Sequence, residues 1–372
     1  MKKQIYLFIF LILIVMTFLS GCHVGRYFFL NAADTKDHER FPYYTVDNAS
    51  PAFSFIESED EWDPRLPEDL MNMNRYENFE TFLEDHHTLA FLVIRNDSIL
   101  YERYLNGAER PDLMTSFSIA KTFVSALTGV AVGEGYISSV DQPVTDFLDG
   151  FRHPGFDQVT IRNLLNMRSG IKFSETYYNP FGHAAKFYYG RNLRKYAYNL
   201  RVNKTPGTEY YYNSANTLIL AMIIEETTGM KFTEYFSEKI WKPLGMDSTA
   251  TWNYDSKKHG MVKAFCCLNA TARDFAKFGR LYLNHGEWNG QQVVPRDWVD
   301  YSMGIHNDSR DLEDYPYTYF WRVLENGSVF AKGILGQYIY LDPSRNLIIV
   351  RFGKKRGDVH WSKLIEDVAS QY

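Results

Sequence analysis

The stretch Ser116-Phe117-Ser118-Ile119-Ala120-Lys121-Thr122-Phe123 places a hydroxyl and an amine at the start of an apolar segment. Ser118 and Lys121 are three positions apart, so their side chains would lie on the same face of a helix. Apolar residues recur at helical spacing further along, and Gly133 with Gly135 provides a stop signal. We therefore expect a helix that begins close to Ser118 and ends near Gly133.

This arrangement has a chemical interpretation. A serine in the first turn of a helix lies beside unpaired backbone N–H groups, which would stabilise an oxyanion formed by attack of Ser118. A lysine that is desolvated in a cleft can remain neutral and accept the serine proton. Ser118 and Lys121 are therefore candidates for nucleophile and base, although the short pattern alone is also that of ordinary helix capping.

Length and composition restrict the class of protein. With 372 residues the chain can bury a large core, and its length suggests two structural regions. A hydrophobic share of 45% argues against disorder. The 40 basic and 45 acidic side chains give a formal charge of -5 without any basic cluster, so we expect no nucleic-acid partner.

Other kinds of site find no support in the sequence. None of the 10 histidines has the spacing of metal ligands, and no glycine-rich phosphate loop is present. We therefore expect neither a metal nor a cofactor. The pattern Gly-x-Ser-x-Gly is absent as well, which argues against an α/β-hydrolase.

The N-terminus has the features of a secretory signal. Two lysines at positions 2 and 3 precede an apolar run over residues 5–19. The last residue of this run is the first of the tetrad Leu19-Ser20-Gly21-Cys22. This tetrad resembles the bacterial lipobox, and the resemblance implies that residues 1–21 are removed and that Cys22 carries a diacylglyceryl group. An uncleaved N-terminal anchor is the alternative. Both predict a protein attached to the membrane in the cell envelope, with the rest of the chain outside the cytoplasm.

Only three cysteines are present, too few for a disulfide framework. Cys266 and Cys267 are neighbours in an apolar run. We expect two buried thiols there and not a disulfide or a metal-binding pair.

The order of the predicted elements indicates an α+β fold. Residues 22–78 are polar and rich in proline, as expected of a tether and a wrapping segment. A catalytic domain would follow over 79–372. Its sheet-forming parts lie at about 86–135 and 261–372, and a mainly helical region at about 136–260 is inserted between them. We expect one antiparallel sheet flanked by helices, with a cleft beside the inserted region.

The strand predictions rest on turn signals. Two β-rich runs over 89–95 and 98–104 are separated by Asn96-Asp97, which predicts a hairpin. Further runs over 329–332, 337–341 and 347–352 precede a terminal helix over 361–372. Helices are also predicted over 217–228, 232–241, 271–283 and 295–302.

Three separated motifs occur in a fixed order: Ser118-x-x-Lys121, Tyr212-Asn213-Ser214, and Gly333-Ile334-Leu335-Gly336-Gln337. Together they resemble the motifs of the serine β-lactamase and penicillin-binding-protein superfamily. Within it, the chain is most similar to class C β-lactamase-related esterases and 6-aminohexanoate-dimer hydrolases. The stretches 161–170 and 268–274 also resemble family signatures, so the likeness spans about residues 86–370 and implies a β-lactamase/transpeptidase-like fold.

The resemblance implies roles for individual residues. Ser118 would be the acylated nucleophile, Lys121 its base, and Tyr212 a second acid or base that protonates the leaving group. The backbone N–H groups of Ser118 and Gln337 would form the oxyanion hole.

Two further residues are implied to contact the substrate. One is Ser214, in the third position of its motif, where a role as a plain turn residue is the alternative. The other is Gly336, in the third motif.

The third motif departs from that of the penicillin-recognising members. They place Lys-Thr-Gly where this chain has Ile334-Leu335-Gly336, so the cation and hydroxyl that hold a substrate carboxylate are missing. On a strand, Lys332 would share a face with Ile334 and would be a weak substitute. This departure favours ester or amide substrates without such a carboxylate.

The sequence thus predicts an extracytoplasmic serine hydrolase that cleaves a small-molecule or peptide-like ester or amide through an acyl-enzyme on Ser118. Within the same fold, the alternatives are a D-amino-acid peptidase, a carboxypeptidase or a β-lactamase. A catalytically silent binding lipoprotein is the alternative from a different class.

Overall fold

The computed structural model describes residues 23–30, 32–59, 62–67, 76–306 and 309–372. Residues 1–21 and Cys22, on which the signal and lipidation predictions fall, lie outside the described residues. Among the described residues, no helix is long and apolar enough to cross a bilayer.

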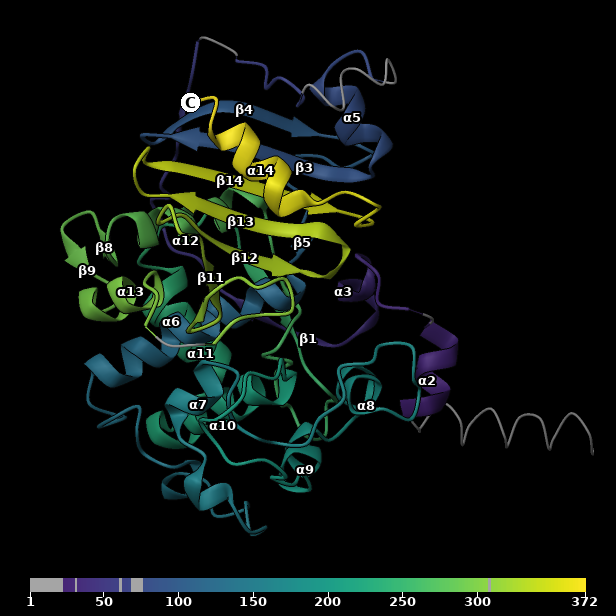
Figure 1. Ribbon diagram of the computed structural model, residues 1–372, viewed down its shortest axis with the longest axis vertical. Coiled ribbons are helices and arrows are strands. Elements are labelled where there is room, and N and C mark those ends of the chain that lie inside the picture. Colours follow the sequence, from purple (N-terminus) through teal and green to yellow (C-terminus); the bar gives the residue numbers. More distant parts are fainter. Residues whose placement is uncertain (1–22, 31, 60–61, 68–75, 307–308) are drawn as a thin grey trace, which may run out of the picture.

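The main sheet combines strands from both parts of the chain (Figure 1). Its strand order is β10-β11-β12-β13-β14-β3-β4-β2, antiparallel except for the parallel pair of β2 and β4. The strands are β2 (Ile56–Glu57), β3 (Thr88–Arg95), β4 (Ser98–Tyr104), β10 (Tyr317–Thr318), β11 (Trp321–Val323), β12 (Val329–Gly333), β13 (Gln337–Asp342) and β14 (Leu347–Gly353). Because β14 pairs with β3, the prediction that strands from the N-terminal and C-terminal parts share a sheet is confirmed.

The hairpin of β3 and β4 forms where it was predicted. Asn96 and Asp97 have φ angles of 51° and 62°, the left-handed values that a two-residue type I′ turn requires at both positions. Alternate residues of β3 enter different cores. Phe91 and Val93 pack under α5 (Phe79–Asp85) and α14 (Trp361–Ala369) in one hydrophobic cluster, whereas Leu92 belongs to the larger cluster on the other face.

A second, smaller sheet lies beside the nucleophile segment. Its order is β1-β6-β7-β5, from β1 (Tyr43–Val46), β5 (Met114–Thr115), β6 (Ala250–Asn253) and β7 (Leu268–Ala270). We expected the strands after about residue 261 to join the main sheet. Instead β7 pairs with β5 and β6, and the main sheet resumes only at β10.

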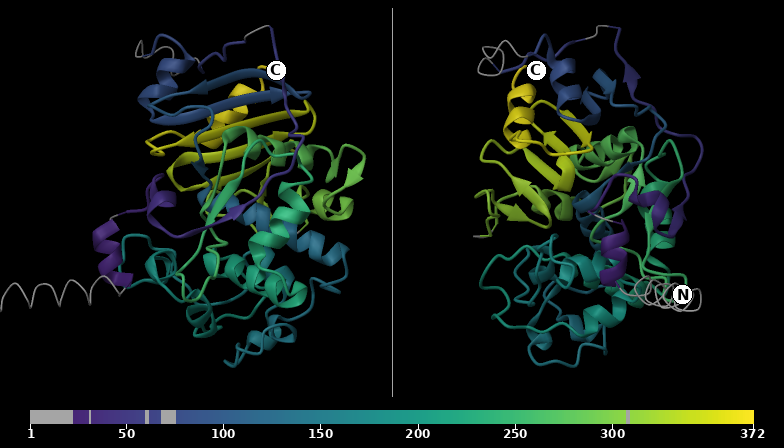
Figure 2. Two further views of the ribbon diagram at one scale, coloured as in Figure 1. Left: turned by 180° about the vertical axis from the view of Figure 1, so that it is seen from behind. Right: turned by 90° about the vertical axis from the view of Figure 1, so that its right-hand side faces the viewer.

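The helical part of the chain lies next to the sheets and carries most of the larger core (Figure 2). The helix predicted over 217–228 begins three residues earlier, at Ser214, because the Asn213 side chain accepts a hydrogen bond from Ala215 N and caps the helix there. The helices not yet named are α2 (His23–Leu30), α3 (Asp37–Arg40), α6 (Ala120–Gly133), α7 (Ile161–Leu165), α8 (His183–Tyr189), α9 (Leu193–Tyr198), α10 (Ser214–Thr228), α11 (Phe232–Phe236), α12 (Ala272–Leu283) and α13 (Arg296–Ser302). A short hairpin of β8 (Glu287–Trp288) and β9 (Gln291–Gln292) precedes α13.

The N-terminal segment contacts both parts of the molecule. Its helix α2 packs against α8, its strand β1 pairs with β6, and β2 extends the main sheet. Phe41 and Phe55 of this segment are buried. The segment is therefore part of the folded body between residues 23 and 57.

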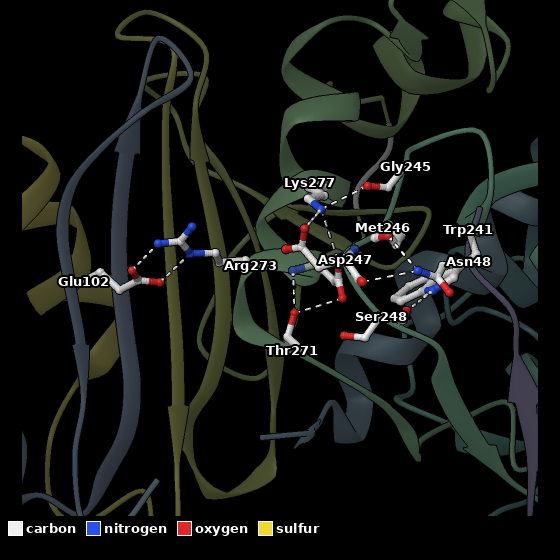
Figure 3. A network of polar contacts seen from close by, with 11 residues as sticks. Asn48, Glu102, Trp241, Gly245, Met246, Asp247, Ser248, Thr271, Arg273 and Lys277 are labelled. Carbon is white, nitrogen blue, oxygen red and sulfur yellow. Dashed lines mark hydrogen bonds and ion pairs between the residues drawn. The ribbon is translucent and has the colours of Figure 1, made fainter. Parts of the chain in front are cut away.

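A polar network joins the main sheet to the helical region through the start of α12 (Figure 3). Arg273 binds both carboxylate oxygens of Glu102 on β4, at 2.8 and 2.5 Å. One turn later, the fully buried Lys277 pairs with Asp247 at 2.7 Å and with Asp274 at 3.4 Å. The stretch 268–274, which resembles a family signature, thus fixes the position of α12.

Candidate active site

Ser118 lies in a tight turn between the small sheet and helix α6. The turn is a 3-10 helix over Phe117–Ile119, and α6 continues from it at Ala120. The buried Phe117 has a φ of 43°, in the left-handed region that non-glycine residues rarely adopt. Ser116 N donates to Leu268 O of β7 at 2.9 Å. The small sheet therefore holds the backbone in the conformation that presents Ser118.

Lys121 lies close enough to Ser118 to exchange a proton with it. Its side chain is only 1% exposed, and Nζ donates to Ser118 Oγ at 3.1 Å and to Phe265 O at 2.9 Å. The ring centroid of Tyr212 lies 5.0 Å from the same nitrogen. The structure thus brings together the three residues predicted to carry out the chemistry, with the spacing that a nucleophile and its base need.

Tyr212 is placed by the turn before α10. The Asn213 amide donates to Ile171 O at 3.1 Å, and Asn213 N contacts Met167 Sδ at 3.3 Å. Tyr211 N donates to Met167 O at 2.7 Å. These bonds attach the tyrosine motif to the end of the 161–170 stretch, which resembles a family signature, and so explain what that stretch does in the fold.

Ser118 opens into two adjoining pockets. The first, of about 280 Å³, is lined mainly by aromatic and small side chains and is called the aromatic pocket. The second, of about 420 Å³, contains acidic and basic side chains and is called the charged pocket. Five residues line both: Ser118, Tyr177, Ile334, Leu335 and Arg356. The serine therefore lies at the junction of two chemically different spaces.

In the charged pocket, two basic side chains are matched by acids. Lys332 Nζ pairs with Glu313 at 2.6 Å, and Arg322 Nε pairs with Asp311 at 2.5 Å. Burial lowers the pKa of Lys332, and the nearby Arg322 acts in the same direction, whereas Glu313 opposes the shift. Lys332 is thus present in the pocket but already has a carboxylate partner.

The third motif is not continuous strand. Residues Ile334–Gly336 form a 3-10 turn between β12 and β13, with Leu335 at a φ of 67°. The expectation that positions 332 and 334 share a strand face is therefore wrong, because the chain turns immediately after Gly333.

Gly333 brings this turn against the nucleophile. A Cβ at this position would lie 2.6 Å from Ser116 O and 3.2 Å from Ser118 N, so only glycine permits the approach. The next residue, Ile334, lines both pockets. The backbone beside Ser118 N is therefore that of Gly333 and Ile334.

The sequence assigned the second oxyanion donor to Gln337, which the structure places elsewhere. Gln337 is fully buried and lines neither pocket that contains Ser118. Its side-chain amide pairs with the backbone of Gly353 at 3.0 and 2.7 Å, a structural role between β13 and β14.

The two predicted substrate-contacting residues lie in different pockets. Ser214 lines the aromatic pocket, and its backbone N donates to the Glu175 carboxylate. Gly336 lines the charged pocket, and its carbonyl accepts a 2.5 Å bond from Arg351 Nη1.

The prediction of two free thiols at Cys266 and Cys267 is wrong. The two cysteines form a disulfide with an S–S distance of 2.01 Å. The chain turns here, with Cys266 N bonded to Lys263 O at 3.0 Å and Cys267 at a φ of 71°, and this conformation brings neighbouring side chains together. The disulfide follows Phe265, whose carbonyl binds Lys121, and Cys266 lines the aromatic pocket.

Sequence reasoning missed Glu175 and Tyr177. Both line the aromatic pocket, and the Tyr177 hydroxyl donates to Glu175 Oε2 at 3.1 Å. They belong to an aromatic stretch without helix or strand periodicity, so no pattern distinguished them from loop residues. Among the residues that the structure describes, no group of His, Cys, Asp or Glu could hold a metal ion.

A family model described as Beta-lactamase matches residues 77–369. This range includes all the residues that line the aromatic and charged pockets except Ala32 and Ala33. The chain belongs to the Beta-lactamase family. It is 30% identical over 297 residues to the 6-aminohexanoate-dimer hydrolase of Paenarthrobacter ureafaciens, covering 74% of this chain and 75% of that protein.

Two further relatives extend the comparison. The teichoic acid D-alanine hydrolase of Staphylococcus aureus is 25% identical over 193 residues, which are 51% of this chain and 45% of that protein. A solved structure from Bacillus anthracis, assigned as a 6-aminohexanoate-dimer hydrolase, has a TM-score of 0.77 and 25% identity, covering 91% of this chain and 90% of that one. The family, the α+β fold and the serine hydrolase class predicted from the sequence are confirmed.

Proposed function

We propose that this protein is an extracytoplasmic serine hydrolase, anchored to the membrane through Cys22, that cleaves an ester or amide through an acyl-enzyme on Ser118. The observation that carries the proposal is the 3.1 Å contact of Lys121 Nζ with Ser118 Oγ at the junction of two pockets. The disulfide next to the site supports the location, because disulfides persist in oxidising compartments.

In the acylation step, Ser118 Oγ attacks the substrate carbonyl carbon and passes its proton to Lys121 Nζ. Negative charge collects on the carbonyl oxygen, where the N–H groups of Ser118 and Ile334 are the proposed donors. The Tyr212 hydroxyl then gives a proton to the departing alkoxide or amine. The bond between the carbonyl carbon and the leaving group breaks, and Tyr212 recovers a proton from Lys121.

Water completes the cycle. It enters where the leaving group departed, gives a proton to the pair of Lys121 and Tyr212, and attacks the acyl carbon. The ester bond to Ser118 Oγ breaks, the serine regains its proton, and a carboxylic acid is released. This sequence consumes one water molecule for each bond cleaved, and its proton transfers use the side chains of Ser118, Lys121 and Tyr212.

Beside Lys332 and Arg322 the charged pocket is a poor receptor for a free carboxylate, and Arg356, which lines both pockets, is its only basic side chain without an ion pair among the described residues. Lys332 and Arg322 each have an acidic partner at 2.6 and 2.5 Å, so neither offers an unmatched charge to a carboxylate. A charge-assisted hydrogen bond contributes about 1.5–3 kcal/mol, so a β-lactam or C-terminal carboxylate would bind at least tenfold more weakly than where a free lysine receives it.

A D-aminoacyl ester is the second candidate substrate. The Staphylococcus aureus relative is named a teichoic acid D-alanine hydrolase, and the aromatic pocket of this chain contains Glu175 beside Ser214. A carboxylate at that place suits the ammonium group of an aminoacyl ester.

Labelling of the nucleophile tests the proposal. A fluorophosphonate should add one adduct to the full chain, located by mass spectrometry on the peptide that contains Ser118. Ser118→Ala should abolish the adduct, whereas Ser125→Ala, a change at a buried serine of the adjoining helix α6 outside both pockets, should retain it. Undiminished labelling of Ser118→Ala would refute the assignment, and no labelling of the wild-type protein would favour a silent binding protein.

Substrate preference is measured on the same preparations. Rates with p-nitrophenyl acetate, a D-alanyl ester and a chromogenic cephalosporin separate the candidates. We expect ester hydrolysis to exceed cephalosporin hydrolysis by at least tenfold. Efficient cephalosporin turnover would mean that Arg356, or Lys332 after separation from Glu313, binds the carboxylate.

A further inference from the structure

The N-terminal segment forms part of the wall of the aromatic pocket. Ala32 and Ala33, which follow α2, line the pocket directly. The same segment holds the wall residues Tyr188 and Tyr189 of α8. Arg26 Nη1 donates to Tyr189 O at 2.7 Å, and the Tyr188 hydroxyl donates to the Asp37 carboxylate at 2.8 Å.

Exposed aromatic side chains occur in α2 and in the segment 176–182, both close in sequence to residues that line this pocket. Phe28 and Phe29 of α2 are 69% and 57% exposed, and they precede the lining residue Ala32 by three or four positions. Tyr178, which itself lines the pocket, is 86% exposed, and Phe181 is 76% exposed. Such large apolar side chains in water are costly in a soluble protein unless another surface covers them.

The position of this rim in the chain indicates what covers it. Helix α2 begins at His23, directly after the predicted lipidated Cys22 and four positions after the end of the apolar run 5–19. Figure 1 shows α2 at the edge of the molecule beside α8, and these two helices pack together. If residues 1–21 are cleaved and Cys22 is lipidated, or if they remain as an anchor, either predicted attachment would hold α2 within a few residues of the bilayer.

The charge of the two helices agrees with this position. Their sequences, HVGRYFFL in α2 and HAAKFYY in α8, contain Arg26 and Lys186 but no acidic residue. Bacterial membranes present anionic headgroups, which attract basic side chains, and aromatic rings prefer the interface between headgroups and hydrocarbon.

We propose that α2, the segment 176–182 and α8 form a membrane-docking face. The aromatic pocket then opens at the bilayer surface and takes up the hydrocarbon part of an ester or amide held in the membrane. The proposal rests on the proposed function, since Ser118, which lines the pocket, performs the cleavage. It narrows the substrate class to amphiphiles that have the scissile bond near the headgroup level.

The test uses the full chain in vesicles of phosphatidylcholine and phosphatidylglycerol. Two rates are measured: hydrolysis of p-nitrophenyl acetate in solution, and hydrolysis of p-nitrophenyl decanoate incorporated into the vesicles. The double variant Phe28→Glu, Phe181→Glu should lower the decanoate rate by about tenfold or more, because it places charges on the docking face, and should leave the acetate rate unchanged. Ile56→Glu, an equally drastic change at an exposed residue of β2, should change neither rate.

A second readout reports the docking face directly. Diazotised sulfanilic acid, which does not enter bilayers, modifies exposed tyrosines. In vesicles, Tyr178 of the wild-type protein should be at least fivefold less modified than the exposed Tyr136, although Tyr178 is the more exposed of the two. The double variant should restore modification of Tyr178.

The outcomes separate this inference from the proposed function. An unchanged decanoate rate in the double variant, or modification of wild-type Tyr178 as strong as that of Tyr136, would overturn the docking face while acetate hydrolysis by Ser118 stands. If the double variant lost acetate hydrolysis as well, the modification of Tyr178 in the wild-type protein would decide whether the docking face exists. Absence of acetate hydrolysis in the wild-type protein would instead count against the proposed function.

Discussion

Lys121 contacts the nucleophile and the carbonyl of Phe265 at the same time, which fixes its amine beside Ser118 Oγ. Removing this amine by Lys121→Ala, or the hydroxyl by Tyr212→Phe, eliminates a proton-transfer group. Each change should lower kcat/KM for p-nitrophenyl acetate by about 10²- to 10⁴-fold. Circular dichroism checks that both variants remain folded.

The neighbouring Tyr211 provides a matched control. It is exposed and lines neither pocket that contains Ser118, so Tyr211→Phe should retain the wild-type rate. Near wild-type turnover in either the Lys121 or the Tyr212 variant would remove that residue from the mechanism.

Gly333 is required by close approach and not by an unusual backbone angle, since its φ of -117° suits any residue. Gly333→Ala places a methyl group 2.6 Å from Ser116 O and forces the turn away from Ser118. Loss of one oxyanion donor lowers kcat by about 10²- to 10³-fold, and we expect a fall of that order. Gly327→Ala, where a Cβ meets no described atom within 4 Å, strains a backbone with a φ of 85° and so lowers stability slightly, but it should leave kcat unchanged. Equal kcat in the two variants would show that the turn is not part of the oxyanion site.

Lys263 is a fully buried amine outside the active site. Its Nζ has no hydrogen-bond partner among the described residues and lies 3.1 Å from the ring centroid of Phe41 in the N-terminal segment. Burial lowers the pKa of Lys263 well below its ordinary value, and Arg26 adds to the shift. Between this lowered pKa and the ordinary lysine pKa of about 10.4, the unfolded chain binds a proton that the folded chain does not, so stability rises with pH in that window.

The substitution Lys263→Met tests whether the buried amine makes stability rise with pH. One proton of difference corresponds to about 1.4 kcal/mol per pH unit in the free energy of unfolding. Urea unfolding between pH 7 and 10 should show a smaller rise of stability with pH in the variant than in the wild-type protein, and greater stability of the variant at pH 7. A variant less stable than the wild type at pH 7 would contradict the expectation.

At the scale of elements, α12 depends on a buried ion pair at its first turns. Burial raises the pKa of Asp274, and the charge of Lys277 opposes that shift. Lys277→Met would leave Asp274 buried without its cation, which costs about 3–5 kcal/mol for a buried pair. Urea unfolding should show a loss of this order. The exposed pair of Lys242 and Glu238 gives the control, because Lys242→Met should cost less than about 1 kcal/mol.

Elements with local signals were predictable, and elements defined by distant partners were not. The hairpin at Asn96-Asp97 and the helix after Ser118 are encoded by turn residues and apolar spacing within a few positions. Strand β5 has two residues and pairs with β7, more than 150 positions away. No periodicity can appear over two residues, so the small sheet that holds the nucleophile turn had no sequence signal.

The same distinction explains the site. Ser118, Lys121 and Tyr212 follow from motifs in which spacing and chemistry are both local. The oxyanion assignment depended on where the third motif turns, and the turn at Ile334–Gly336 is fixed by packing of Gly333 against Ser116 and Ser118. A contact between segments this far apart is not visible in either one alone.

For the whole molecule, attachment to the membrane remains a prediction about Cys22. In a bacterial host, the intact protein should be found in the membrane fraction with a diacylglyceryl group on Cys22, and Cys22→Ser should block that modification. Mass spectrometry of the purified protein measures this directly. An unmodified Cys22 with residues 1–21 still attached would favour the plain N-terminal anchor.

Because Cys266 and Cys267 form a disulfide, the redox conditions of expression should affect the activity of the purified protein. The disulfide closes a small ring immediately after Phe265, whose carbonyl binds the base Lys121. Protein accumulated in a reducing bacterial cytoplasm would contain two thiols instead, and the ring that fixes this carbonyl would be open. Two batches of identical sequence would then differ in specific activity, and treatment with a mild oxidant would bring the weaker batch up to the stronger.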